Sequence, residues 1–151
     1  MTLSELLAQS KGQPIRWQEH WVHAIYRVKA HDGLTLCLRW TRRGPTTPVQ
    51  GVSFQLKGGR FSVLGTKSSG VVLWADRPED VLLRCEGRGV KELSLWNCWR
   101  DSRGVMSAWV GNAGMLIDDR DPHVIRFRCN SNPDEITFDD LGFEIRIQDE
   151  R

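Results

Sequence analysis

The sequence lacks the features of a membrane protein and those of an exported one. It has no hydrophobic run long enough to cross a bilayer, and residues 1–8 contain neither a basic region nor the apolar stretch of a signal peptide. We therefore expect a cytoplasmic protein that does not contact a membrane.

Charge of one sign is also scarce. The chain has 21 Lys and Arg against 19 Asp and Glu, which gives a formal net charge of +2, and the longest basic run is the pair Arg42 and Arg43. Binding to nucleic acid depends on clustered basic side chains that neutralise phosphates. The interleaved charges therefore predict no nucleic-acid partner.

Motifs for cofactors and nucleophilic catalysis are absent. There is no Gly-x-Gly-x-x-Gly, no Gly-Lys-Ser/Thr loop and no Gly-x-Ser-x-Gly elbow, so we expect no nucleotide cofactor and no serine hydrolase. The cysteines include no Cys-x-x-Cys pair and the histidines no His-x-His pair, so no metal site is expected and the thiols are predicted to be free. These residues are Cys37, Cys85, Cys98, Cys129, His20, His23, His31 and His123.

What the sequence does contain is apolar residues at every second position. Leu34, Leu36, Leu38 and Trp40 alternate with mostly polar residues, which is typical of a strand with one buried face. The same reasoning predicts strands at residues 22–28, 52–57, 61–64, 71–75, 81–85, 93–99, 106–110, 124–129 and 143–147. Glycines and turn-forming residues separate them, and the pair Gly58-Gly59 predicts a tight hairpin.

This pattern predicts an all-β fold, a two-layer antiparallel β-sandwich of the jelly-roll kind, in one domain of residues 1–151. One short helix precedes it. Thr2 and Glu5 have the spacing of a capping box, and the helix is expected to end near Gln9, within a helical N-terminal extension of residues 1–14.

The seven tryptophans are the most distinctive feature. Aromatic side chains commonly fill cores, which is the simplest interpretation. The alternative is a ligand-binding face, because an indole ring can stack on a sugar while neighbouring amide and guanidinium groups bind its hydroxyls. The candidate binding residues are Trp96, Asn97, Arg100, Trp109 and Asn112. On a regular strand, Trp96 and Arg100 share one face while Asn97 points inward and needs partners.

Three functions remain open. The first is a non-catalytic domain that binds a small ligand, with carbohydrate as the best candidate. The second is an interaction or assembly domain, such as a homodimer, because tryptophan and arginine are enriched at interfaces. The third is an enzyme that uses the acidic residues around Asp118 or Asp139 with His123 as acid or base. Those Asp and Asn residues also form turns, which is the interpretation we favour over calcium binding.

Overall fold

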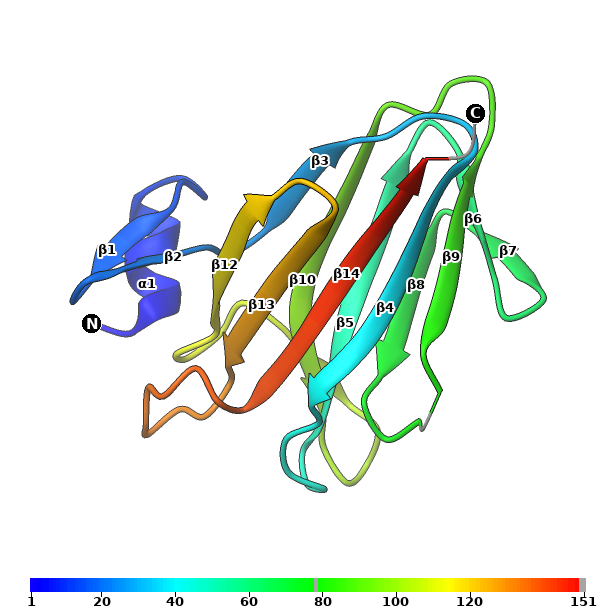
Figure 1. The fold of residues 1–151 in the computed structure, drawn as a ribbon. Helices are drawn as coiled ribbons and strands as arrows, with labels where there is room; N and C mark the ends of the chain where they lie inside the picture. Colours follow the sequence, from blue (N-terminus) through cyan, green and yellow to red (C-terminus); the bar gives the residue numbers. More distant parts are fainter. Residues whose placement is uncertain (78, 150–151) are drawn as a thin grey trace.

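The computed structural model describes residues 1–77 and 79–149, and these form one short helix and fourteen strands (Figure 1). The elements, in chain order, are α1 (Leu3–Gln9), β1 (Ile15–Trp17), β2 (His20–Val22), β3 (Tyr26–Lys29), β4 (Leu34–Arg42), β5 (Val49–Lys57), β6 (Arg60–Val63), β7 (Thr66–Ser68), β8 (Gly70–Trp74), β9 (Val81–Glu86), β10 (Glu92–Arg100), β11 (Met106–Ser107), β12 (Gly114–Asp121), β13 (Val124–Asn130) and β14 (Leu141–Asp149).

Two antiparallel sheets lie face to face. The seven-stranded sheet has the order β12-β13-β14-β4-β9-β6-β7, and the five-stranded sheet has the order β11-β10-β5-β8, with β3 also paired to β10. Figure 1 shows β12, β13, β14 and β4 as the near layer and β10, β5 and β8 behind it. The predicted two-layer antiparallel sandwich with one short helix is therefore confirmed.

The core lies between the layers and follows the alternation of the sequence. Leu36 and Leu38 of β4 are buried against the other sheet, whereas Arg39 beside them is exposed. Phe54 of β5 meets Phe61 of β6 across the layers, with ring centroids 6.3 Å apart in an edge arrangement. Each fully buried side chain of this size contributes roughly 1.5–3 kcal/mol to folding, so the core is the main source of stability.

A smaller N-terminal unit lies at one end of the sandwich. It consists of α1 and the β1-β2 hairpin, at the left of Figure 1, and has its own apolar cluster around Leu3, Leu7, Val22 and Phe138. Thr2 caps the helix as predicted, since the Glu5 backbone N–H donates to Thr2 Oγ1 over 3.2 Å, while the Glu5 carboxylate accepts from the Thr2 hydroxyl over 3.0 Å. Among the described residues, no helix has the length and apolar character needed to span a bilayer.

The Gly58-Gly59 hairpin prediction is wrong. β5 pairs with β10 and β8, whereas β6 pairs with β9 and β7, so the chain crosses from one sheet to the other at these glycines. Gly58 has a positive φ of 86°, and an added Cβ would lie 1.8 Å from the carbonyl oxygen of Gly89. The glycines therefore allow two loops to pack closely, because glycine has no Cβ. The same property makes glycine common in tight turns, which is why the pair predicts a hairpin.

Two predicted strands are also corrected. Residues 22–28 do not form one strand: β2 pairs with β1, and β3 pairs with β10 after an intervening bend. In residues 106–110 only Met106 and Ser107 are in a strand, and Trp109 has a positive φ of 57°. Strand alternation could not show either interruption, because residues in a bend can be apolar too. The short strands β1 and β7 and the longer β12 were not predicted.

Candidate binding face

Most of the tryptophans lie outside the core. Trp40 is the one that is buried, with 8% of its surface exposed, whereas Trp17, Trp74, Trp96 and Trp99 are half-buried. The other two, Trp21 and Trp109, are 56% and 45% exposed. Trp40 belongs to the core as the simplest interpretation has it, Trp96 and Trp17 are partly buried against the two apolar clusters, and Trp21 and Trp109 lie outside them. The rest of the core is filled mainly by aliphatic side chains and phenylalanine.

Trp96 and Trp109 form a pair on the outer face of the five-stranded sheet. In β10, Leu93 and Leu95 are buried on the inner side, and Trp96 alternates with them. Its ring centroid lies 4.7 Å from that of Trp109, with an angle of 33° between the rings. The Trp109 indole N–H donates to the carbonyl oxygen of Ala24 over 3.1 Å. This bond and the neighbouring ring hold Trp109 in place although nearly half of its surface is exposed.

Trp74 and Arg100 continue the same outer face. Trp74 of β8 is paired in register with Gly51 of β5, where an added Cβ would lie 2.6 Å from the indole ring. The ring therefore lies directly over the glycine. Arg100 covers it from outside, with Cζ 4.5 Å from the ring centroid, and donates to the Asp76 carboxylate over 2.6 Å. We call Trp74, Trp96, Arg100 and Trp109 the tryptophan face.

Trp74 and Asp76 were not among the candidates predicted from the sequence, although a signal for Trp74 was present. In the predicted strand of residues 71–75, the apolar residues Val71, Leu73 and Ala75 alternate inward, which places Trp74 outward. The pairing with Arg100 comes from residues far apart in the sequence. Nothing in local spacing indicated it.

The structure places the other two candidate residues inside the protein. The Asn97 side chain is buried, as its alternation predicted, and donates to the carbonyl oxygen of Asn130 over 3.1 Å. Asn112 accepts from the backbone N–H of Leu3 over 3.0 Å and donates to the carbonyl oxygen of Pro133 over 2.8 Å. The polar atoms of both amides thus bind backbone groups of neighbouring segments. Trp96, Arg100 and Trp109 are the candidates that share the outer face.

A shallow apolar cavity borders the tryptophan face. It has a volume of about 230 Å³ and lies between α1 and Trp109, with Leu7, Ala24 and Ala113 also in its wall. A ring held against Trp109 could extend its apolar side into this cavity. The polar groups of Arg100 and Asp76 lie farther along the same sheet.

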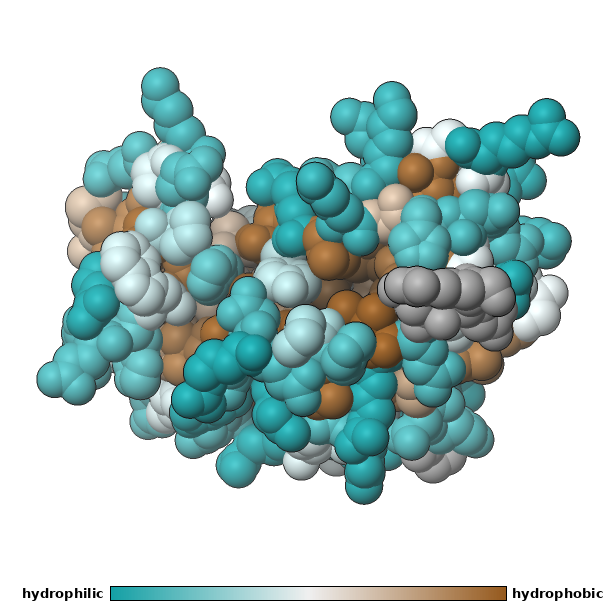
Figure 2. Space-filling view, turned by 45° about the horizontal axis from the view of Figure 1, so that its top comes forward, coloured by the Kyte–Doolittle hydropathy of each residue, from teal (hydrophilic) through white to brown (hydrophobic). Residues whose placement is uncertain are grey.

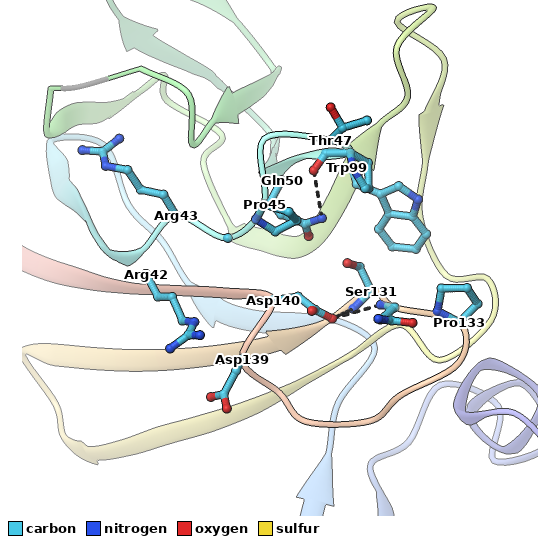
Figure 3. A pocket seen from close by; sticks show the side chains of 13 residues that line it. Arg42, Arg43, Pro45, Thr47, Gln50, Trp99, Ser131, Pro133, Asp139 and Asp140 are labelled. Atoms are coloured by element: carbon cyan, nitrogen blue, oxygen red, sulfur yellow. Dashed lines mark hydrogen bonds between the residues drawn. The ribbon is translucent and has the colours of Figure 1, made fainter.

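A larger cavity of about 790 Å³ lies at the end of the sandwich (Figure 3). Figure 3 shows the Trp99 indole at one side of this cavity and Arg42 pointing toward Asp139. Its polar groups are largely occupied by loop contacts. Asp140 accepts from the backbone N–H groups of Ser131 and Asn132, over 2.8 and 2.9 Å. We therefore regard this cavity as weaker evidence for a ligand than the tryptophan face.

Asp118 and Asp139, the acidic residues proposed for catalysis, are each paired with an arginine and not with the His123 imidazole. Asp118 is paired with Arg120 over 2.7 Å, and this neighbour lowers the pKa of Asp118 to about 2. Asp139 is paired with Arg128 over 2.9 Å, and Asp121 accepts from the backbone N–H of His123 in a turn. Residues 1–77 and 79–149 contain no group of three or more His, Cys, Asp or Glu side chains arranged to hold a metal ion.

His23 differs from the sequence interpretation. Alternation along the predicted strand of residues 22–28 would put His23 on the exposed face beside Arg27, but it is half-buried and lines a separate cavity with Trp21, Tyr26 and Asp119. The reason is the bend after β2, which turns His23 toward β12. The backbone N–H of His23 donates to the carbonyl oxygen of Met115 over 2.9 Å.

Comparisons with protein-family models, with curated proteins and with solved structures each found no match to this chain.

Proposed function

We propose that this chain is a non-catalytic binding domain whose tryptophan face takes a ring-shaped small ligand, with carbohydrate as the class that fits best. The observation that carries the proposal is the placement of Trp74, Trp96 and Trp109 on the outer side of the five-stranded sheet. Trp74 and Trp109 are not part of the core between the sheets, and Trp96 only packs against its margin. Large aromatic side chains left outside a complete core are typical of binding surfaces.

The chemistry of the face suits a ligand with an apolar ring face and polar edges. Trp109 offers an exposed indole, and the bond to Ala24 fixes its orientation. Arg100 is held by Asp76 and by the Trp74 ring, so its remaining guanidinium N–H groups are fixed for hydroxyl binding. Because these side chains are already ordered, binding costs little conformational entropy.

An assembly domain is the second candidate, and one specific observation supports it. Val105, Met106 and Val110 are each at least 50% exposed and lie in the segment that joins β10 to β12, next to Trp109. Exposed apolar side chains around tryptophan and arginine are also typical of protein interfaces. The two candidates use the same surface but differ in what covers it.

The test is isothermal titration calorimetry with a panel of neutral oligosaccharides, on protein whose solution mass is measured in the same buffer. We expect saturable binding to at least one saccharide. Trp109→Ala is expected to weaken it by about tenfold or more, since loss of an aromatic stacking partner removes on the order of 1–3 kcal/mol. Arg100→Ala is expected to weaken it less, because a water can replace one hydrogen bond.

Trp17→Ala is the control, because Trp17 is a half-buried tryptophan of the N-terminal hairpin that packs on Phe138 and is not part of the tryptophan face. It should leave saccharide affinity unchanged. A dimer that Trp109→Ala converts to monomer, together with no heat of binding across the panel, would favour the assembly domain. Binding that survives Trp109→Ala unchanged would contradict the proposed site.

A further inference from the structure

A second cavity, of about 420 Å³, lies away from the tryptophan face. It is found where β2, β3 and β12 meet beside the N-terminal unit, and its wall includes Trp21, His23, Tyr26, Ile117 and Asp119. Figure 2 shows a notch between the N-terminal unit on the left and the sandwich, with hydrophobic side chains in its floor and hydrophilic ones around it.

Rigid elements bring the polar groups of this cavity together. His23 and Met115 exchange two backbone hydrogen bonds of 2.9 Å, which attach the end of β2 to β12. Met115 and Ile117 alternate along the regular part of β12, and Asp119 follows where the ladder with β13 becomes irregular, in the same cavity wall as Ile117. The Tyr26 ring packs edge-on against Phe127, with centroids 5.4 Å apart. The site therefore does not depend on a long loop.

Three polar groups in the cavity have no protein partner. Within the part of the chain that the structure describes, the His23 imidazole, the Tyr26 hydroxyl and the Asp119 carboxylate make no hydrogen bond or ion pair. The neighbouring Asp118, by contrast, is neutralised by Arg120. His23 and Tyr26 are half-buried, and half-buried polar groups normally find partners. Asp119 is exposed at the mouth of the cavity, so its carboxylate is open to a ligand that enters from solvent.

The charge of Asp119 acts on the other groups of the cavity. Burial lowers the pKa of His23 below its ordinary value of 6.5, and Asp119 partly opposes this effect. Burial also raises the pKa of Tyr26, and Asp119 raises it further. At neutral pH the imidazole and the phenol are therefore uncharged, and the cavity carries the negative charge of Asp119.

The aromatic wall favours positive charge as well. Trp21 is 56% exposed, and the guanidinium carbon of Arg16 lies 5.5 Å from its ring centroid. Arg16 is therefore in cation–π contact with one part of the ring, and it does not itself line the cavity. Aromatic faces beside a carboxylate are the arrangement that binds organic ammonium groups.

We propose that this cavity binds a small organic cation of the quaternary ammonium class, with Asp119 supplying the negative charge and Trp21 and Tyr26 supplying aromatic surface. A quaternary ammonium group is poorly hydrated and has no N–H donor, so aromatic contact and a carboxylate recognise it better than hydrogen bonds do. The Tyr26 hydroxyl and the His23 imidazole remain available to a hydroxyl group on the same ligand.

The experiment measures binding by isothermal titration calorimetry, with choline as the probe. The matched control ligand is the uncharged alcohol in which a tert-butyl group replaces the trimethylammonium group of choline. We expect choline to bind and the alcohol to bind at least about tenfold more weakly, because only the cation interacts with Asp119 and the ring quadrupoles. Asp119→Asn and Trp21→Ala are each expected to reduce choline affinity by about tenfold.

Asp118→Asn is the matched control variant. It removes the same charge one residue away, but Asp118 is paired with Arg120 and lies outside this cavity, so choline affinity should not change. Choline affinity should also fall once the pH drops through the lowered pKa of His23, because a protonated His23 would repel the ligand. Tyr26 and Asp119 are the other titratable groups of the cavity wall.

Three results would overturn the proposal: no choline binding at millimolar concentration, equal affinity for the alcohol, or equal losses in Asp118→Asn and Asp119→Asn. The last result would show a general effect of net charge. Trp109→Ala should not affect choline, so this test is independent of the one for the tryptophan face.

Discussion

At the scale of single residues, Asn130 connects more of the molecule than its place in the sequence suggests. Its side chain is completely buried and donates to the carbonyl oxygens of Asn112, Asn132 and Glu135 over 2.9–3.2 Å. Its Oδ1 accepts from the backbone N–H groups of Thr137 and Phe138, over 3.0 and 3.2 Å. One amide therefore satisfies backbone groups of two loops. One of these loops carries Asn112, whose side chain accepts from the Leu3 N–H at the start of α1.

We predict that Asn130→Ala destabilises the domain by about 3 kcal/mol, because it leaves several buried backbone groups without partners. Urea unfolding followed by circular dichroism measures the loss. Asn132→Ala is the control, since its side chain caps an exposed turn and accepts only from Asp134 and Glu135. That change should cost less than about 1 kcal/mol. Equal losses in the two variants would refute the central role of Asn130.

At the scale of strands, the alternation of apolar and polar residues predicted most of the long strands. It failed where a strand has the polar composition of a turn. β4, β5, β9, β10, β13 and β14 lie close to their predicted ranges because each has one buried face. The pairing of these strands was not available, since alternation shows which face is buried and not which strand is the neighbour. β12 was missed because its second half, with Asp118 and Asp119, has the composition of a turn.

The sequence also predicted part of the candidate site, namely which side chains of β10 point outward and which point inward. Alternation placed Trp96 and Arg100 on one face and Asn97 inward, and the structure agrees. The contribution of Trp109 depends on a positive φ, which no residue pattern indicated. The cavity of His23 and Asp119 joins two segments about a hundred residues apart in the chain, so sequence spacing carried no information about it.

The pairing of β5 with β8 gives a prediction at this scale. An added Cβ at Gly51 would lie 2.6 Å from the Trp74 ring and 2.9 Å from the carbonyl oxygen of Leu73. We therefore expect Gly51→Ala to displace Trp74 and to destabilise the domain by roughly 1–3 kcal/mol, as overpacking does. Thermal unfolding measures the stability, and the tryptophan emission spectrum reports the ring.

Gly70→Ala is the matched control for that change. Gly70 belongs to the same pair of strands, but its added Cβ would meet nothing nearer than the carbonyl oxygen of Phe54 at 3.7 Å. We expect a stability change within about 0.5 kcal/mol. If Gly51→Ala were as mild as Gly70→Ala, the close contact between the glycine and the indole would not exist in solution.

At the scale of the whole molecule, the sandwich hides its thiols on both sides of a sheet. Cys85 and Cys129 are in the core between the layers, and Cys98 is fully buried although it lies on the outer side of β10. Cys98, Gly51 and Trp74 occupy one row across three strands. Because Gly51 has no side chain, Trp74 is the next residue in this row whose side chain can lie beside Cys98.

Thiol reactivity follows from this arrangement. Burial raises the pKa of Cys85 to about 11 and that of Cys98 to about 12, and it also raises the pKa of Cys129 and of the half-buried Cys37. The thiolate is the reactive form, so at pH 8 the native protein should react with Ellman's reagent only slowly and only at Cys37. All four thiols are free and should react once guanidinium unfolds the chain.

Cys37→Ser should leave a native protein with no reacting thiol, which identifies the slow site. Adding Trp74→Ala to that variant should then expose Cys98 and restore one slow reaction, while Trp17→Ala should not. This pair of variants links thiol chemistry to the tryptophan face, because Trp74 lies in the same row as Cys98 with only Gly51 between them. Fast reaction of Cys98 in the intact protein would mean that Trp74 does not stay over Gly51, and the ordered face that the proposed ligand requires would then be absent.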